Sequence, residues 1–122
     1  IDIKRTVNKS VRLPFEEIAR EALPENYELS LVICGDKLAQ RMNREYRNKT
    51  YYPNVLSFEL GRDSGEIFLN VRKAEREARM MGIPFRNRLA LLFVHGCFHL
   101  KGMAHGLTME GAEKRVLRKF GF

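Results

Sequence analysis

The segment from residue 54 to residue 70, "NVLSFELGRDSGEIFLN", determines the fold class. Its first half alternates two sets of side chains, as a strand with two different faces does: Val55, Ser57 and Glu59 on one face, Leu56, Phe58 and Leu60 on the other. Turn residues occupy 61–65, and a second apolar run follows at 66–70. The two runs are predicted to pair as an antiparallel hairpin.

Three helical patterns follow the hairpin, at 71–82, 88–101 and 108–120. The first is expected to bury its apolar side, namely Val71, Ala74, Ala78 and Met81. The second is the most apolar and is predicted to be the central buried helix, capped by Asn87 and ended by Gly102.

Two strand patterns, at 1–7 and 27–34, precede the hairpin, together with helical patterns at 15–23 and 37–47. The helix at 37–47 is expected to bury Leu38, Met42 and Tyr46, which turns its arginines away from the core. The order β-α-β-α-β-β-α-α-α predicts an α+β fold, with a small mixed sheet of about four strands packed with about five helices. We interpret residues 1–122 as a single domain.

The charge balance points to a polyanionic partner. Lys and Arg number 22 against 15 Asp and Glu, for a net charge of +7, which favours nucleic acid. No apolar run approaches the roughly 20 residues that span a bilayer, and the first residues do not resemble a signal or transit peptide. We therefore expect a cytoplasmic protein, with Cys34 and Cys97 as free thiols.

All three histidines lie within "HGCFHLKGMAH", residues 95–105. His95 and His99 are one helical turn apart on one face, and Gly102 allows the chain to fold back so that His105 becomes a third ligand. Three imidazole ligands leave a fourth tetrahedral position open, as in catalytic zinc sites, where a bound water has a pKa near 7. The pattern predicts one Zn²⁺ at the end of the central helix; the alternative is ordinary hydrogen-bonded core histidines.

The same spacing occurs in metzincin proteases, whose signature places a glutamate directly after the first histidine. Gly96 stands at that position, and glycine cannot abstract a proton. A protease is therefore disfavoured.

Taken together, the motifs resemble the YbeY family, bacterial metal-dependent endoribonucleases that act in maturation of small-subunit ribosomal RNA. The similarity spans residues 29–117 and rests on three motifs: the His-Gly-x-x-His-Leu-x-Gly-x-x-His run, "NREYRNKTYYPNVLSFEL" and "GEIFLN". One position departs from the family, which usually has an aspartate before the third histidine where this chain has Ala104. Glu110 and Glu113 follow soon after and are candidates to replace that carboxylate.

The resemblance implies several roles. His95, His99 and His105 would hold zinc, Arg47 would correspond to a family arginine that holds a phosphate near the metal, and Ser57 would present its hydroxyl to the substrate. Alternatively, Arg47 is a solvated charge at a helix end and Ser57 bonds to backbone. The small ribosomal subunit and the GTPase Era are the partners implied, with a monomer favoured.

The leading hypothesis is a zinc-dependent endoribonuclease directed at single strands, acting in ribosomal RNA maturation and ribosome quality control. Clusters of Arg and Lys on the predicted helices could track the RNA backbone, although each could equally be a solvated helix face: Arg41, Arg44, Arg72, Arg76, Arg79, Lys114, Arg115, Arg118 and Lys119. Two alternatives stay open: an RNA-binding ribosome-assembly factor whose zinc is structural, and a metal-dependent hydrolase of peptides or small molecules.

Overall fold

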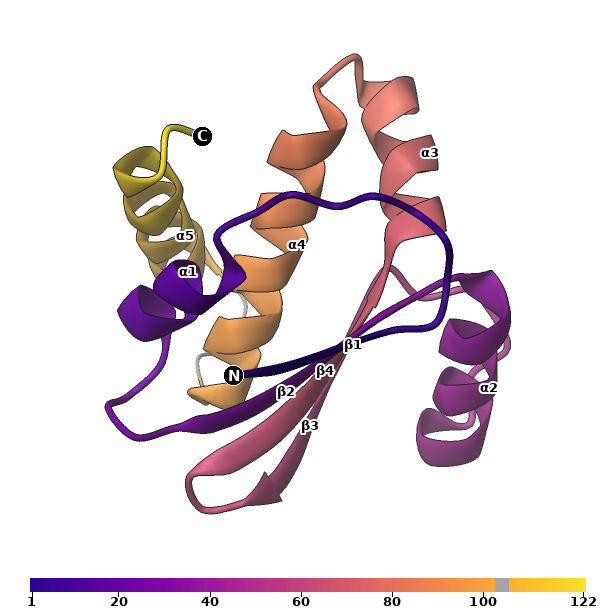
Figure 1. The fold of residues 1–122 in the computed structure, drawn as a ribbon, viewed down its shortest axis with the longest axis horizontal. Coiled ribbons are helices and arrows are strands. Elements are labelled where there is room, and N and C mark those ends of the chain that lie inside the picture. Colours follow the sequence, from indigo (N-terminus) through magenta and orange to yellow (C-terminus); the bar gives the residue numbers. More distant parts are fainter. Residues whose placement is uncertain (103–105) are drawn as a thin grey trace.

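The structure is a computed structural model, and it describes residues 1–102 and 106–122. Its elements, in chain order, are β1 (Asp2–Arg5), α1 (Phe15–Ala22), β2 (Glu28–Cys34), α2 (Asp36–Arg47), β3 (Val55–Gly61), β4 (Ser64–Asn70), α3 (Val71–Met81), α4 (Phe85–Leu100) and α5 (Leu107–Lys119). The predicted α+β class and element order are confirmed (Figure 1). Within the described residues, none of the helices has both the length and the apolar character needed to cross a bilayer.

The four strands form one mixed sheet in the order β1-β2-β4-β3. β1 and β4 both pair with β2 in parallel, and β3 pairs with β4 in the antiparallel hairpin that the sequence predicts. In that hairpin Val55 lies opposite Leu69 and Ser57 opposite Ile67. β3 is therefore an edge strand, and its polar face is left for a helix to cover.

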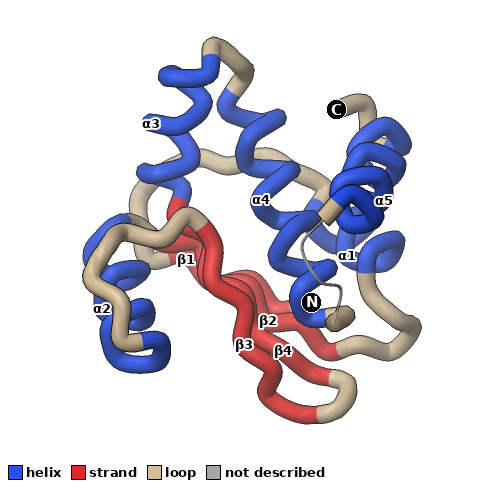
Figure 2. Tube along the Cα trace, turned by 180° about the vertical axis from the view of Figure 1, so that it is seen from behind, coloured by secondary structure: helices blue, strands red, loops and turns tan. Residues whose placement is uncertain are grey.

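The two faces of the sheet are covered unequally (Figure 2). Alternate strand residues such as Leu31, Ile33, Ile67 and Leu69 belong to the main core, which also includes buried residues of α1, α3, α4 and α5. The opposite face packs a smaller cluster against α2, made of Val32, Cys34, Ala39, Leu56 and Phe68. The period of two along each strand separates these sets, because successive side chains point to opposite faces.

α4 is the central helix, as predicted, and most of its residues are buried. It begins earlier than expected, because Pro84 and not Asn87 is its N-cap residue. Proline has its φ fixed near the helical value, so a helix can start directly after it, and Asn87 is then inside the first turn. Gly102 has a φ of 89°, the left-handed conformation expected where the chain leaves the helix.

Two expected core residues are exposed. Met81 is 56% exposed at the end of α3, and Tyr46 is 66% exposed on α2. On α2 the fully covered positions are Ala39 and Asn43, while the predicted Leu38 and Met42 are partly buried against the same cluster. The buried face is therefore rotated slightly from the predicted stripe. Helical periodicity alone cannot choose between two adjacent stripes when a helix packs on only one side.

Asn70 connects the two layers at the end of β4. It is fully buried and caps α3 through its side-chain oxygen, which accepts from the backbone N–H groups of Arg72 and Lys73. Its side-chain nitrogen donates to Asp36 Oδ1 and to the carbonyl of Pro53. This one amide therefore fixes the start of α3 relative to α2 and to the loop that leads into the hairpin.

Candidate metal centre

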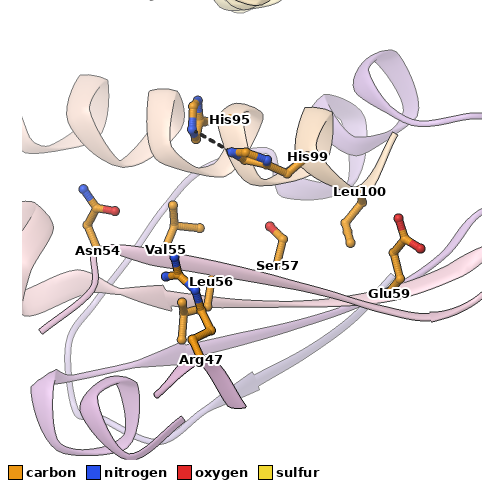
Figure 3. A pocket seen from close by; sticks show the side chains of 9 residues that line it. All are labelled: Arg47, Asn54, Val55, Leu56, Ser57, Glu59, His95, His99 and Leu100. Carbon is orange, nitrogen blue, oxygen red and sulfur yellow. Dashed lines mark hydrogen bonds between the residues drawn. The ribbon is translucent and has the colours of Figure 1, made fainter. Parts of the chain in front are cut away.

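α4 places His95 and His99 one turn apart on a half-buried side of the helix. The Nε2 atoms of the two rings lie 3.1 Å apart, with the ring planes nearly perpendicular (Figure 3). Their neighbours Val94, Gly96, Cys97 and Phe98 are all buried, so the helix holds both imidazoles rigidly at one site. The structure therefore brings the two rings together, as the spacing of His95 and His99 predicts.

Glu113 on α5 orients the His95 ring. Its carboxylate Oε2 lies 2.7 Å from His95 Nδ1, and the glutamate is only 6% exposed. A carboxylate accepts a hydrogen bond, so Nδ1 of the neutral ring carries the proton and Nε2 presents its lone pair. Carboxylates that bond the far nitrogen of a metal-ligating histidine in this way are common in metal sites.

The distance between the two Nε2 atoms tests whether the pair suits zinc. Two nitrogens that each lie about 2.0–2.1 Å from a tetrahedral zinc ion would be roughly 3.3 Å apart. The observed 3.1 Å is close to that separation. The separation of the His95 and His99 Nε2 atoms therefore matches that of two ligands of one zinc ion.

The third predicted ligand, His105, lies outside the described residues, as does Ala104. In the part of the chain that the structure describes, no set of three His, Cys, Asp or Glu side chains gathers at one point. The prediction of three histidine ligands, and of zinc itself, therefore stays a prediction.

Gly96 allows α4 to lie directly on β3. A β-carbon at this position would be 3.1 Å from the Ser57 hydroxyl oxygen and 3.2 Å from Val55 Cγ2, tighter than most β-carbon contacts in proteins. A glutamate at this position, as metzincin proteases carry, would require the edge strand to shift away from α4, which gives a physical reason for the glycine. The Ser57 hydroxyl donates to the carbonyl of Gly96 at 2.9 Å, so it fastens the strand to the helix.

A cleft of about 380 Å³ opens between α4, β3 and the end of α2. Figure 3 shows the two imidazoles on its α4 side and Arg47 across from them, beyond the edge strand. The residues that line it are Arg47, Asn54, Val55, Leu56, Ser57, Glu59, His95, His99 and Leu100. The structure thus brings four of the five predicted site residues, Arg47, Ser57, His95 and His99, to one cavity.

Arg47 is positioned by Asn43 and Tyr51. One guanidinium nitrogen donates to Asn43 Oδ1 at 3.2 Å and to the Tyr51 hydroxyl at 3.3 Å. Asn43 is itself fully buried and donates to the backbone carbonyl of Tyr51. Because these bonds use one edge of the guanidinium, its remaining N–H groups can bind oxygen atoms of a ligand.

A second hollow of about 260 Å³ lies beside the cleft and shares Asn54 and His95 with it. Arg88 lines this hollow and is paired with Glu77 at 3.0 Å, and Glu77 also accepts from Asn54. Asn54 and His95 are therefore the shared wall of two adjoining cavities. The side of the imidazole pair that borders this second hollow is therefore polar as well.

Neither thiol is suited to act as a nucleophile. Burial raises the pKa of Cys34 to about 12 and also raises the pKa of Cys97. Cys97 packs in the main core, as expected from its place on the opposite side of α4 from the histidines.

Two residues of the site, Asn43 and Asn54, were not assigned a role by sequence reasoning. Both residues fall within the "NREYRNKTYYPNVLSFEL" motif, but the sequence alone does not predict the direction in which their side chains point. Glu113 was recognised as a candidate carboxylate, and the structure separates it from Glu110, which is exposed.

The chain matches the family model described as endoribonuclease YbeY over residues 1–121. Among curated proteins, the endoribonuclease YbeY of Thiobacillus denitrificans is 37% identical, with 81% of this chain and 74% of that protein aligned. The endoribonuclease YbeY of Aromatoleum aromaticum is 38% identical, with 85% and 73% aligned.

Among solved structures, the solution structure of a Thermotoga maritima protein has a similar fold. Its TM-score is 0.66 at 22% sequence identity, and the match covers 86% of this chain and 75% of that one.

Proposed function

The chain belongs to the YbeY family of endoribonucleases, hydrolases that act on RNA, and from this premise we propose that it is a zinc-dependent enzyme cleaving single-stranded RNA in the α4–β3 cleft. The observation that carries this proposal is the pair of imidazole Nε2 atoms 3.1 Å apart in a cavity that Arg47 also lines. A phosphate-binding guanidinium opposite a metal-binding pair suits phosphodiester chemistry.

One Zn²⁺ would be held by His95, His99 and His105. When bound, it would supply a Lewis acid for the scissile phosphate and a means of generating a nucleophile at neutral pH. The fit of the His95–His99 pair to zinc distances and the Glu113 carboxylate behind His95 support this assignment.

The chain's own residues would bind and orient the substrate. Arg47 would hold a non-bridging phosphate oxygen, since Asn43 and Tyr51 fix the direction of its guanidinium. Ser57 would act indirectly, because its hydroxyl proton is donated to the Gly96 carbonyl and keeps the helix that carries the ligands in place. Its oxygen can still accept a hydrogen bond from the substrate.

We propose a biological setting from the family resemblance. The enzyme would act in the cytoplasm, as a monomer, in maturation of small-subunit ribosomal RNA and in ribosome quality control. The small ribosomal subunit and the GTPase Era would be its partners. The net charge of +7 is consistent with a polyanionic partner such as ribosomal RNA.

The test is metal analysis and RNA cleavage of the wild type beside His99→Ala. We expect the variant to lose bound zinc and cleavage together, because the remaining ligands cannot hold the ion alone. Lys101→Ala is the matched control, since Lys101 is the exposed C-cap residue of the same helix, two positions after His99. If His99→Ala keeps full metal content and full cleavage, the proposal is wrong.

The same experiment separates the two alternatives. A wild type that binds zinc and RNA but cuts no RNA, and whose domain unfolds on zinc removal, would be an assembly factor with a structural metal. Cleavage of peptides in place of RNA would indicate a different hydrolase.

A further inference from the structure

A second basic surface lies on α2, away from the imidazole pair. It is an open hollow of about 820 Å³, here called the α2 hollow, formed by the segment after β1, the first two turns of α2 and the start of α3. Four cationic side chains line it: Lys37, Arg41, Arg44 and Arg72. Thr6 adds a hydroxyl at its margin.

The positive charge of the α2 hollow is not cancelled locally. Its one acidic lining residue, Asp36, accepts two hydrogen bonds from Arg76 and one from Asn70. Glu45 lies 3.9 Å from Arg41 in a solvent-exposed pair, which contributes little. Within the described residues, the side chains of Lys37 and Arg44 take part in no hydrogen bond or ion pair.

The helix α2 contributes residues to both the α2 hollow and the cleft. Lys37, Arg41 and Arg44 are spaced four and three residues apart, so they form one stripe along α2. Arg47 follows three residues later at the last position of the helix and lines the cleft. The four cations thus cover about 15 Å of helix axis, leading from the imidazole pair to the hollow.

We propose that the α2 hollow binds the sugar-phosphate backbone of the RNA strand that leads away from the cleft. This inference rests on the proposed function, since it assigns the path of the same substrate. Arginine forks bind phosphate oxygens well, and a row of cations with little competing acid suits a polyanion of regular spacing. The enzyme therefore prefers longer RNA strands, in addition to recognising the phosphate at the cleavage site.

The experiment compares two triple variants that remove the same charge. Lys37→Gln, Arg41→Gln and Arg44→Gln alter the α2 hollow, whereas Arg12→Gln, Arg20→Gln and Arg86→Gln remove three exposed charges that line neither the cleft nor the α2 hollow. The substrates are two single-stranded RNAs, one of about 15 nucleotides and one of about four. Single-strand binding sites of proteins span about 4–16 nucleotides, so the longer RNA lies within this range and the shorter one at its lower limit. The zinc-loaded proteins are assayed for kcat/KM over a range of salt concentrations.

We expect the α2 hollow variant to reduce the preference for the longer RNA, measured as the ratio of the two kcat/KM values, by about tenfold or more. The salt dependence of the longer RNA should also weaken, with its log–log slope falling by about 2 for three lost phosphate contacts. The control triple should keep the wild-type ratio. An unchanged ratio in the hollow variant, or an equal loss in both triples, overturns the inference.

Binding of the longer RNA, measured by fluorescence anisotropy on the same proteins, separates this inference from the proposed function. If the wild type cuts no RNA, the proposed function fails, and selective weakening of binding in the hollow variant still supports the assignment of the surface. A poly-glutamate peptide and a competitor RNA of equal charge are then compared as competitors for the bound RNA. If the peptide displaces the RNA as effectively as the competitor RNA does, the surface would be assigned to an acidic protein segment and the inference would be overturned.

Discussion

The two faces of the sheet differ in how they are covered and in what they do. The face under α1, α3, α4 and α5 carries a deep apolar core, and α4 holds the imidazole pair at its border (Figures 1 and 2). The other face carries only α2 and a small cluster around Phe68, with cations along the exposed side of that helix. Metal ligands need a rigid support, whereas contact with a flexible polyanion needs only accessible charge.

The largest expected effect is on stability and contrasts the two cores. Phe93→Ala should cost about 3–5 kcal/mol in unfolding free energy, because Phe93 is fully buried and packs edge-on against Phe15 at 5.0 Å. Phe58→Ala, on the α2 face, should cost only about 1–2 kcal/mol, since Phe58 is half-buried. Urea denaturation measures both; equal losses would contradict the contrast between the faces.

The next effect concerns the support of the metal site. Glu113→Gln should weaken zinc binding by about 10- to 100-fold, because the buried carboxylate that polarises His95 becomes a neutral amide. Competition with a chelator of known affinity measures it. Glu110→Gln is the matched control, one turn earlier on α5 and exposed. Equal affinities for the Glu113 variant and the wild type would show that this hydrogen bond does not tune the site.

A third prediction tests how closely α4 must approach the sheet. Gly96→Ala should destabilise the fold by about 1–2 kcal/mol, because the new methyl group presses on Ser57 and Val55 of the edge strand. Gly111→Ala on α5 meets no neighbouring atom and should stabilise by about 0.5–1 kcal/mol through helix propensity. Thermal unfolding of the two variants gives the opposite signs directly. A stabilised Gly96 variant would mean that the edge strand yields easily.

The smallest effect links α2 to α3 and depends on pH. The hydrogen bond from Arg76 is the main cause that lowers the pKa of Asp36 below its ordinary 3.8. A lowered carboxyl pKa contributes stability above the ordinary value, and that contribution is lost as pH falls through the folded-state pKa. Asp36→Asn should therefore cost up to about 1 kcal/mol at neutral pH, since the pair is partly exposed, and progressively less below about pH 4.

Unfolding free energies of the wild type and the Asp36 variant across the acid range measure this difference. Glu45→Gln, which breaks only the exposed pair with Arg41, should change stability very little at any pH. A constant difference between the Asp36 variant and the wild type at all pH values would exclude the ionic origin of the effect.

Much of the fold could be predicted because its signals are local. The alternation at 54–60 and the turn at 61–65 specify the hairpin, and the left-handed glycines Gly82 and Gly102 mark the ends of α3 and α4. The start of α4 could not be placed, because both Pro84 and Asn87 are acceptable helix starts and only packing selects one. The exposure of Tyr46 and Met81 likewise depends on which neighbours reach them.

By itself, the sequence determined that His95 and His99 lie one turn apart on the most apolar helix, because helical geometry depends only on residue spacing. Only the tertiary structure decided that Glu113 lies behind His95, that Arg47 faces the same cleft, and that Ser57 bonds to Gly96. Those relations join elements far apart along the chain. They follow from how the helices pack on the sheet, which no local pattern specifies.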